Sequence, residues 1–241
     1  MLKDRILWGV IMAVAVVIVA LIDSFWLTFV VFGVLLYFAF EEAKKLFNAK
    51  QANIIFVLIA FVLASISKEP LAFAALLFLL VLGYLVYIKA DTLKEALPYL
   101  YPTVPIFALW QLYLDQGMFV LFWLIFIVVV CDSSAYFIGK LIGTTPFSQT
   151  SASKTREGVI GGLICATVLG MLFGLFQYGF FLSLFCAFFV AIFAVIGDLL
   201  ESYFKRKADL KDSGSLIPGH GGLLDRIDAI IIAPFVLIAL L

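Results

Sequence analysis

The sequence has little charge and hardly any histidine. Of its 241 residues, 13% are charged and 65% are hydrophobic, and His220 is the only histidine. Soluble domains are typically about half apolar and about a quarter charged, so this apolar excess is too large for a soluble core. Acidic and basic residues balance at 16 each, which leaves no global charge favouring nucleic acid as a partner. We therefore predict an integral membrane protein.

Cysteine is also scarce. Cys131, Cys165 and Cys186 lie in or at the edge of apolar runs, and none forms a C-x-x-C pair. We interpret them as small buried hydrophobic residues. A cleavable signal peptide is not expected, because the first apolar run leads directly into a second one without an obvious small-residue cleavage site.

Long apolar runs are abundant, and they predict the fold class. A helix needs about 20 apolar residues to cross the hydrocarbon core. About nine runs qualify or come close, which predicts an all-α, polytopic protein. They are Ile6–Ile22, Phe25–Phe40, Asn53–Ser67, Leu71–Ile88, Tyr101–Tyr113, Met118–Ile138, Val159–Leu175, Phe180–Leu200 and Arg226–Leu241. The shortest runs could also be tilted or re-entrant, so eight or ten spans remain open.

The distribution of lysine and arginine predicts the orientation. With nine spans, all 16 basic residues except Lys68 fall on the side of the N-terminus. Short cytoplasmic loops carry such an excess, so we predict a cytoplasmic N-terminus and an external C-terminus. We expect a multi-pass protein of the cell (inner) membrane whose active site faces the cytoplasm.

Polar segments divide the chain by function. We predict that residues 1–117 form a lipid-facing scaffold and that residues 118–241 form the catalytic region, with cytoplasmic loops 139–158 and 201–226. The polar segments 41–52 and 89–98 are interpreted as solvated connections whose lysines attract anionic lipid headgroups.

Four aspartates occur at or near membrane depth, where a charge is costly and therefore indicates function. Residues three apart share a helix face, so Asp225 and Asp228 are expected to point at one site, as are Asp198 and Glu201. Carboxylates on two helices suit Mg²⁺, which prefers oxygen ligands and keeps several waters. The alternative is that these aspartates cap helices or pair with neighbouring cations. The four aspartates are Asp132, Asp198, Asp225 and Asp228.

Cations and glycines fill the segment between Asp198 and Asp228. Glycines let backbone N–H groups approach an anion, and a helix starting near Leu224 would add its N-terminus. Together with the carboxylates, this composition predicts a site for a metal and a phosphate. Two interpretations of His220 remain open, as a turn residue or as an acid or base. The cations are Lys205, Arg206, Lys211 and Arg226, and the glycines are Gly214, Gly219, Gly221 and Gly222.

The loop 139–162 is a second candidate. Lys154, between Ser151 and Thr155, could reach a phosphate, although plain solvation explains the same pattern equally well. Three glycines, Gly158, Gly161 and Gly162, lie where a helix enters the membrane, and close helix packing is the simplest account of them.

Several of these motifs resemble those of phosphatidate cytidylyltransferases of the bacterial type, also called CDP-diacylglycerol synthases. The resemblance covers roughly the C-terminal half of the chain and is strongest in the last motif. The motifs are Ser202-Tyr203-Phe204-Lys205-Arg206, Lys211-Asp212-Ser213-Gly214, Ile217-Pro218-Gly219-His220-Gly221-Gly222-Leu223-Leu224-Asp225-Arg226-Ile227-Asp228, Asp132-Ser133, Ala135-Tyr136-Phe137, Gly139-Lys140, Gly197-Asp198 and the spaced series Ser151, Lys154, Thr155, Gly158, Gly161 and Gly162.

The resemblance implies that CTP and phosphatidic acid react to give CDP-diacylglycerol and pyrophosphate in phospholipid biosynthesis. It also implies Mg²⁺, with K⁺ as a second cation in a paired site held here by Asp198 and Asp225, and a polytopic enzyme of a kind that can form homodimers. We expect catalysis to involve Asp198, Lys205, Arg206, Lys211, Asp225, Arg226 and Asp228. We expect substrate binding to involve Asp132, Ser151, Lys154, Thr155, Ser202, Asp212, Gly219, His220, Gly221 and Gly222.

The middle loop departs from the family pattern. Ala152 and Ser153 stand where a proline and then a glycine or lysine are frequent, and the segment 144–147 lacks basic residues. Two other functions remain as alternatives. One is a membrane transporter or channel, because intramembrane carboxylates also mark ion pathways. The other is a CTP-dependent transferase that acts on another lipid phosphate.

Overall fold

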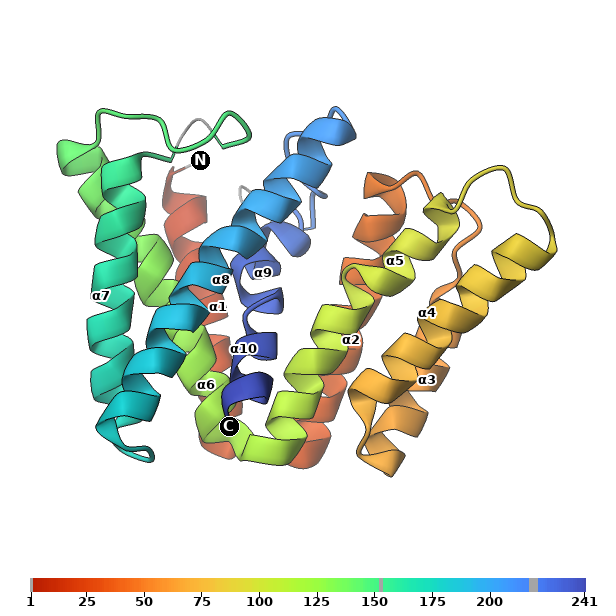
Figure 1. The fold of residues 1–241 in the computed structure, drawn as a ribbon, viewed down its shortest axis with the longest axis horizontal. Coiled ribbons are helices and arrows are strands. Elements are labelled where there is room, and N and C mark those ends of the chain that lie inside the picture. Colours follow the sequence, from red (N-terminus) through yellow and green to blue (C-terminus); the bar gives the residue numbers. More distant parts are fainter. Residues whose placement is uncertain (1, 152–153, 217–220) are drawn as a thin grey trace. The chain divides into compact units, whose positions relative to one another are not determined.

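The computed structural model describes residues 2–151, 154–216 and 221–241, and helices are the regular elements in this part of the chain. No β-strand occurs in these ranges, which confirms the all-α prediction (Figure 1). The elements are α1 (Leu2–Ile22), α2 (Phe25–Leu46), α3 (Ile54–Ser67), α4 (Pro70–Tyr87), η1 (Lys94–Ala96), α5 (Leu97–Leu100), α6 (Thr103–Ile142), α7 (Arg156–Gly174), α8 (Phe180–Lys207), α9 (Leu224–Ile231) and α10 (Pro234–Leu240).

Within the described residues, five helical stretches are long and apolar enough to cross a membrane, as a membrane protein requires. They are α2, α4, the stretch Lys94–Ile142 that contains α6, α7 and α8. Two further apolar helices, Leu7–Ile22 and α3, are shorter. The apolar helices agree with the predicted membrane protein, whereas the count of nine spans and the cytoplasmic N-terminus stay predictions.

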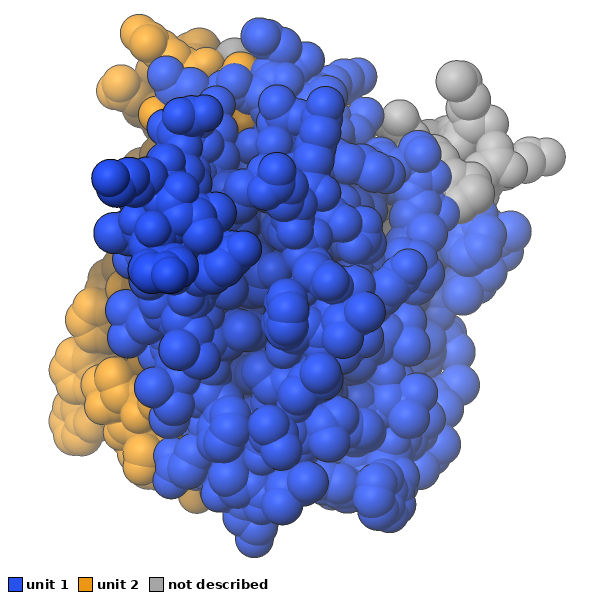
Figure 2. All heavy atoms as spheres, turned by 90° about the vertical axis from the view of Figure 1, so that its right-hand side faces the viewer, with its two compact units in different colours: residues 1–118, 207–227 blue, residues 119–206, 228–241 orange. Residues whose placement is uncertain are grey.

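The chain forms two compact units, coloured separately in Figure 2. The first contains Met1–Met118 and Lys207–Ile227, and the second contains Phe119–Arg206 and Asp228–Leu241. The boundary after residue 118 lies beside the boundary predicted between scaffold and catalytic region. The segment 207–227, however, belongs to the unit of the N-terminal helices, although its motif was assigned to the catalytic region.

In the first unit, α3 and α4 lie side by side and α2 packs on α3 (Figure 1). Trp110 of α6 is fully buried against Phe32 and Phe61, and its indole nitrogen donates to Ser65 Oγ at 2.9 Å. The aromatic rings supply a large apolar contact area while the indole N–H keeps a partner.

The polar connections of this unit are partly buried, so their interpretation as solvated segments is wrong in part. Glu95 accepts hydrogen bonds from the backbone nitrogens of Gln51 and Ala52, both at 2.9 Å, and thereby ties the two connections together. Glu42 is 5% exposed because α2 continues to Leu46, beyond the apolar run that ends at Phe40.

Helix α6 is two helices joined at Gly117, whose φ of 78° and ψ of −176° are not helical. Residues other than glycine rarely adopt a positive φ, so this position favours glycine. The predicted runs Tyr101–Tyr113 and Met118–Ile138 lie on either side of this kink, as the apolar pattern indicated.

In the second unit, α7 packs closely on the second part of α6. A Cβ atom at Gly158 would lie 2.5 Å from the carbonyl oxygen of Ala135, and one at Gly162 would lie 2.7 Å from that of Cys131. The helix backbones therefore approach each other through small residues. This contact confirms close packing as the explanation of these glycines.

Cys131 and Cys186, also in the second unit, are buried as predicted, whereas Cys165 is half-buried.

The last predicted span, Arg226–Leu241, is two short helices, so that prediction is wrong as a continuous span. Helix α9 has eight residues and α10 has seven, which gives each a length of about 10–12 Å. Pro234 opens α10 and has no backbone N–H to donate back into the preceding turn, which explains the break.

Candidate functional site

A cluster of charged side chains occupies one end of the second unit. The ammonium of Lys154 lies 2.8 Å from Asp198 Oδ2 on α8 and 3.6 Å from Asp132 Oδ1 on α6. Asp228 of α9 is close enough to interact electrostatically with Asp132, Asp198 and Lys154. Three predicted site carboxylates thus surround one predicted site lysine. We call Asp132, Lys154, Asp198 and Asp228 the carboxylate–lysine cluster.

The loop before α7 folds back on itself and so positions Lys154. The backbone nitrogen of Phe147 donates to the carbonyl of Lys154 at 2.8 Å, and that of Arg156 donates to Thr145 at 2.9 Å. Thr155 caps α7, because its hydroxyl oxygen accepts a hydrogen bond from Gly158 N at 3.2 Å. Hydrogen bonds therefore anchor this loop. Plain solvation, one of the two interpretations that the sequence left open, does not describe Lys154.

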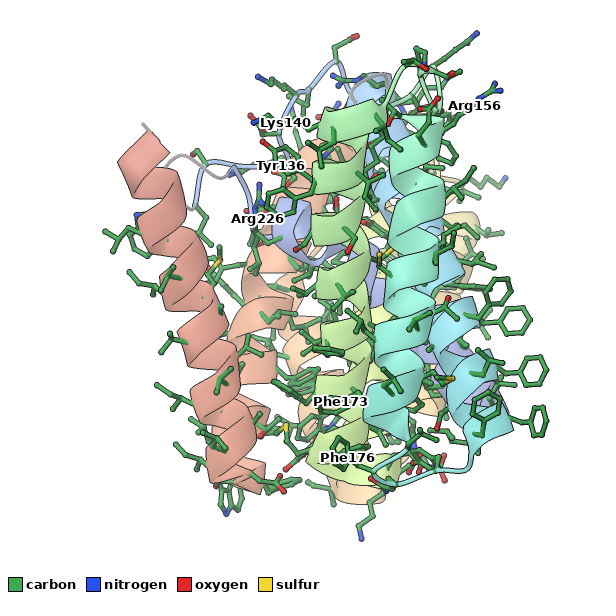
Figure 3. The ribbon with its side chains drawn as sticks, turned by 90° about the vertical axis from the view of Figure 1, so that its left-hand side faces the viewer. Tyr136, Lys140, Arg156, Phe173, Phe176 and Arg226 are labelled. Carbon is green, nitrogen blue, oxygen red and sulfur yellow. The ribbon has the colours of Figure 1, made fainter. Side chains whose placement is uncertain are left out.

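Glu157 is a second anchor of the same loop. Its carboxylate accepts hydrogen bonds from Thr144 Oγ1 at 3.1 Å and from the backbone nitrogens of Thr144 and Thr145. Thr144 and Thr145 therefore bind the first turn of α7. Figure 3 shows Lys140 and Arg156 at this end of α6 and α7, with Phe173 and Phe176 at the other.

The cluster determines the charge of its lysine. Burial favours the neutral form of Lys154, but the carboxylates of Asp198 and Asp132 outweigh it and raise the pKa of the ammonium above its ordinary value. Lys154 therefore carries its proton at neutral pH and can compensate negative charge.

Helix α8 contributes to the cluster because its backbone contacts α9. A Cβ atom at Gly197 would overlap the carbonyl oxygen of Asp228, so glycine allows Asp198 to lie beside Asp228. One turn further on, Lys205 lies 3.3 Å from Glu201 Oε1, and the Glu201 side chain is fully buried. Lys205, predicted to neutralise phosphate, is thus engaged with a carboxylate of its own helix.

A second network of carboxylates lies within the first unit, around Ser213. Asp225 Oδ2 accepts hydrogen bonds from Ser213 N and Gly222 N, both at 2.8 Å, and lies 3.0 Å from Ser213 Oγ. Gly221 has a φ of 84°, a conformation that suits glycine and brings the chain back to Asp225. Asp225, in the first turn of α9, therefore ties Ser213 and Gly222 to the start of this helix.

Glu42 completes this network, and sequence reasoning missed it. Its carboxylate accepts hydrogen bonds from Leu223 N at 2.8 Å, Leu224 N at 2.9 Å and Ser213 Oγ at 2.9 Å. The backbone nitrogens of Leu223 and Leu224, at the start of α9, thus donate to a side-chain carboxylate. A phosphate at this helix end, as the sequence suggested, would have to displace this carboxylate.

The remaining predicted site residues differ in their exposure. Lys211, Asp212, Arg206 and Arg226 are exposed, and Ser151 and Ser202 are half-buried. Gly219 and His220 lie outside the described residues, so their predicted roles stay predictions.

The predicted metal ligands belong to different units, Asp198 to the second and Asp225 to the first. Among the described residues, no group of three or more histidine, cysteine, aspartate or glutamate side chains is arranged to hold a metal ion. The donors do fit Mg²⁺ in chemistry, since both are carboxylates and Asp198 already faces an ammonium ion. Their joint role at a metal stays a prediction.

Comparison with known proteins identifies the family. A model of the cytidylyltransferase family matches residues 3–241. A phosphatidate cytidylyltransferase of Helicobacter pylori is 38% identical over 243 aligned positions, which cover 99% of this chain and 91% of the relative. The enzyme of that name from Bacillus subtilis is 31% identical, covering 97% and 96%. That of Haemophilus influenzae is 44% identical over 50% of this chain and 45% of the relative. This chain therefore belongs to the cytidylyltransferase family.

Proposed function

We propose that this protein transfers the cytidylyl group of CTP to phosphatidic acid and releases CDP-diacylglycerol and pyrophosphate. The observation that carries the proposal is the nearly end-to-end similarity to a phosphatidate cytidylyltransferase, 38% identical over 99% of the chain. The apolar helices suit a lipid substrate that stays in the bilayer. No observation favours a transporter or channel.

The reaction joins two anions, so the protein must neutralise charge where they meet. An oxygen of the lipid phosphate forms a bond to the α-phosphorus of CTP, and the bond to the bridging oxygen of pyrophosphate breaks. A phosphate monoester has a second pKa near about 6, so the lipid phosphate is largely ionised at neutral pH. The attacking oxygen therefore needs no strong general base, and positioning and electrostatics account for catalysis.

Lys154 is the cation that we expect to contact a substrate phosphate. Asp132 and Asp198 keep it protonated and hold it in one place, which removes the cost of ordering a long side chain during the reaction. The exposed cations Arg206, Lys211 and Arg226 would compensate further charge as CTP arrives from water.

Asp198 and Asp225 are the residues that would hold Mg²⁺. The carboxylate–lysine cluster places three carboxyl groups around one ammonium, and carboxyl oxygens are ligands that suit a divalent cation. When bound, the metal would supply electrostatic stabilisation of phosphate oxygens. A second cation such as K⁺ and a homodimer belong to the same proposal, by resemblance to the family.

Release of pyrophosphate tests the proposal directly. Purified protein in detergent receives phosphatidic acid and Mg²⁺ with CTP, ATP, GTP or UTP in separate reactions. We expect release with CTP alone, dependent on phosphatidic acid and abolished by EDTA. If folded protein releases no pyrophosphate with phosphatidic acid but does so with another lipid phosphate, that other lipid phosphate would be assigned as the substrate. Inactivity with every nucleotide and lipid phosphate would overturn the proposal.

A further inference from the structure

Glu42 is a buried carboxylate in a helix that carries none of the predicted site residues. It lies near the end of α2 and is 5% exposed, yet its hydrogen-bond donors come from a segment 171 to 182 residues further along the chain. Both groups belong to the first unit. A buried carboxylate is costly unless it is hydrogen-bonded, and here three donors satisfy it.

The backbone around Glu42 is shaped to approach it. A Cβ atom at Gly214 would lie 2.6 Å from Glu42 Oε1, and one at Gly222 would overlap Glu42 Oε2. Any larger residue at either position would push the segment away from the carboxylate. Two glycines of the motif are therefore explained by Glu42 and need no contact with substrate.

Ser213 connects Glu42 to Asp225. Its hydroxyl oxygen lies 2.9 Å from Glu42 Oε2 and 3.0 Å from Asp225 Oδ2. A hydroxyl has a single proton, so it donates to one carboxylate at a time while its position constrains both. The backbone nitrogen of Ser213 also donates to Asp225 at 2.8 Å. Movement of Ser213 would therefore move Asp225.

We infer that Glu42 is a positioning residue, which acts through Ser213 and the start of α9 to hold Asp225 in place for the reaction. The inference rests on the proposed function, since Asp225 is the predicted metal ligand. This inference gives α2, a helix of the predicted scaffold, a part in the active site. It also gives Glu42 a role that its neighbour Glu41 does not share.

Three variants test this role against a matched control. Glu42→Gln replaces one acceptor by a donor that faces a backbone N–H, and Ser213→Ala removes the connecting hydroxyl. The double variant combines them. Glu41→Gln is the control, because Glu41 is adjacent on α2 but pairs with Lys44 at 3.1 Å. The measurements are kcat and KM for both substrates, and the rate of trypsin cleavage after the exposed Lys211, followed by mass spectrometry.

We expect Glu42→Gln and Ser213→Ala each to lower kcat at least about tenfold, since misplacement of a catalytic group by about 1 Å can cost more than that. KM for phosphatidic acid should stay within about twofold, and the double variant should be no slower than Glu42→Gln. Cleavage after Lys211 should accelerate at least about tenfold in both single variants and remain at the wild-type rate in Glu41→Gln.

The inference is overturned if Glu42→Gln matches Glu41→Gln in kcat and cleavage rate, or if the two single effects multiply in the double variant. If Glu42→Gln cannot be purified folded, Ser213→Ala decides, and its wild-type behaviour would overturn the inference. Failure of the proposed function is a different result. The wild type would then release no pyrophosphate, while the cleavage rates would still report whether Glu42 orders the segment.

Discussion

Lys154 shows how one residue serves both stability and chemistry. Its ammonium compensates Asp132 and Asp198, and about a quarter of its side chain remains accessible. The sequence left open whether Lys154 reaches a phosphate or is only solvated, and the spaced series Ser151, Lys154 and Thr155 resembles the family. The carboxylate partners of Lys154 come from two other helices, and no local pattern could show that pairing.

Replacing Lys154 tests its two roles. We expect Lys154→Met to reduce turnover at least about 100-fold, as loss of one electrostatic donor to the transition state does. It should also lower stability by about 2 kcal/mol, because Asp198 loses a charged hydrogen-bond partner. Pyrophosphate release and thermal unfolding in detergent measure both effects. Lys50→Met, at an exposed loop position, is the control and should behave like the wild type.

The pH dependence of that stability difference follows from the raised pKa of Lys154. A folded-state pKa above the unfolded value, which is about 10.4, makes the stabilisation complete below that pH and lost only as pH rises through the folded value. The difference in melting temperature between wild type and Lys154→Met should therefore stay constant from about pH 7 to pH 10 and narrow above it. Narrowing below about pH 9 would contradict the raised pKa.

Glu42 illustrates what sequence reasoning missed at the residue scale. Glu42 follows an apolar run and stands beside Glu41, a pattern that is typical of the solvent-exposed end of a membrane helix. One signal was present, because Glu42 lies three residues after Ala39 and four before Leu46, and both are buried on α2. That spacing places Glu42 on the inward face of the helix. Its hydrogen-bond donors, however, come from the distant segment 213–224.

The helices themselves were predictable because hydropathy is a local property. Apolar runs located α1 to α4, α7 and α8 and both parts of α6. Errors arose where a helix continues past its apolar run, as α2 and α8 do, and where Pro234 interrupts one. Polar residues continue these helices beyond the apolar runs, so hydropathy alone underestimated where the helices end.

The contact between α6 and α7 gives a prediction at the scale of elements. Gly162→Ala should destabilise the protein by about 1–3 kcal/mol, because the added methyl group would lie 2.7 Å from the carbonyl oxygen of Cys131. Gly83→Ala in α4 is the control, since no atom lies within 4 Å of the added group. Thermal unfolding compares them, and equal melting temperatures would contradict the packing account.

At the scale of the whole molecule, the membrane topology awaits a direct measurement. Helix α3 has 14 residues and a length of about 21 Å, which is short for a hydrocarbon core of about 30 Å. In a variant without Cys131, Cys165 and Cys186, cysteine is placed either at Lys50 or at Glu69. We expect an impermeant maleimide to label Glu69→Cys in intact cells and Lys50→Cys only after permeabilisation.

The same labelling tests whether α3 crosses the membrane. Labelling of both positions from one side would show that α3 does not cross the membrane, and the predicted count and orientation would need revision. The control is protein with no cysteine, which should remain unlabelled.

The grouping of residues 207–227 with the N-terminal helices has a consequence for biosynthesis. The ribosome adds Glu42 long before Ser213, its partner 171 residues later. During most of translation, Glu42 therefore lacks the donors that satisfy it in the finished protein. A nascent chain released early, or a gene fragment that starts after residue 118, would lack one side of this network. Glu42 can therefore meet all of these donors only after the ribosome has added Leu224.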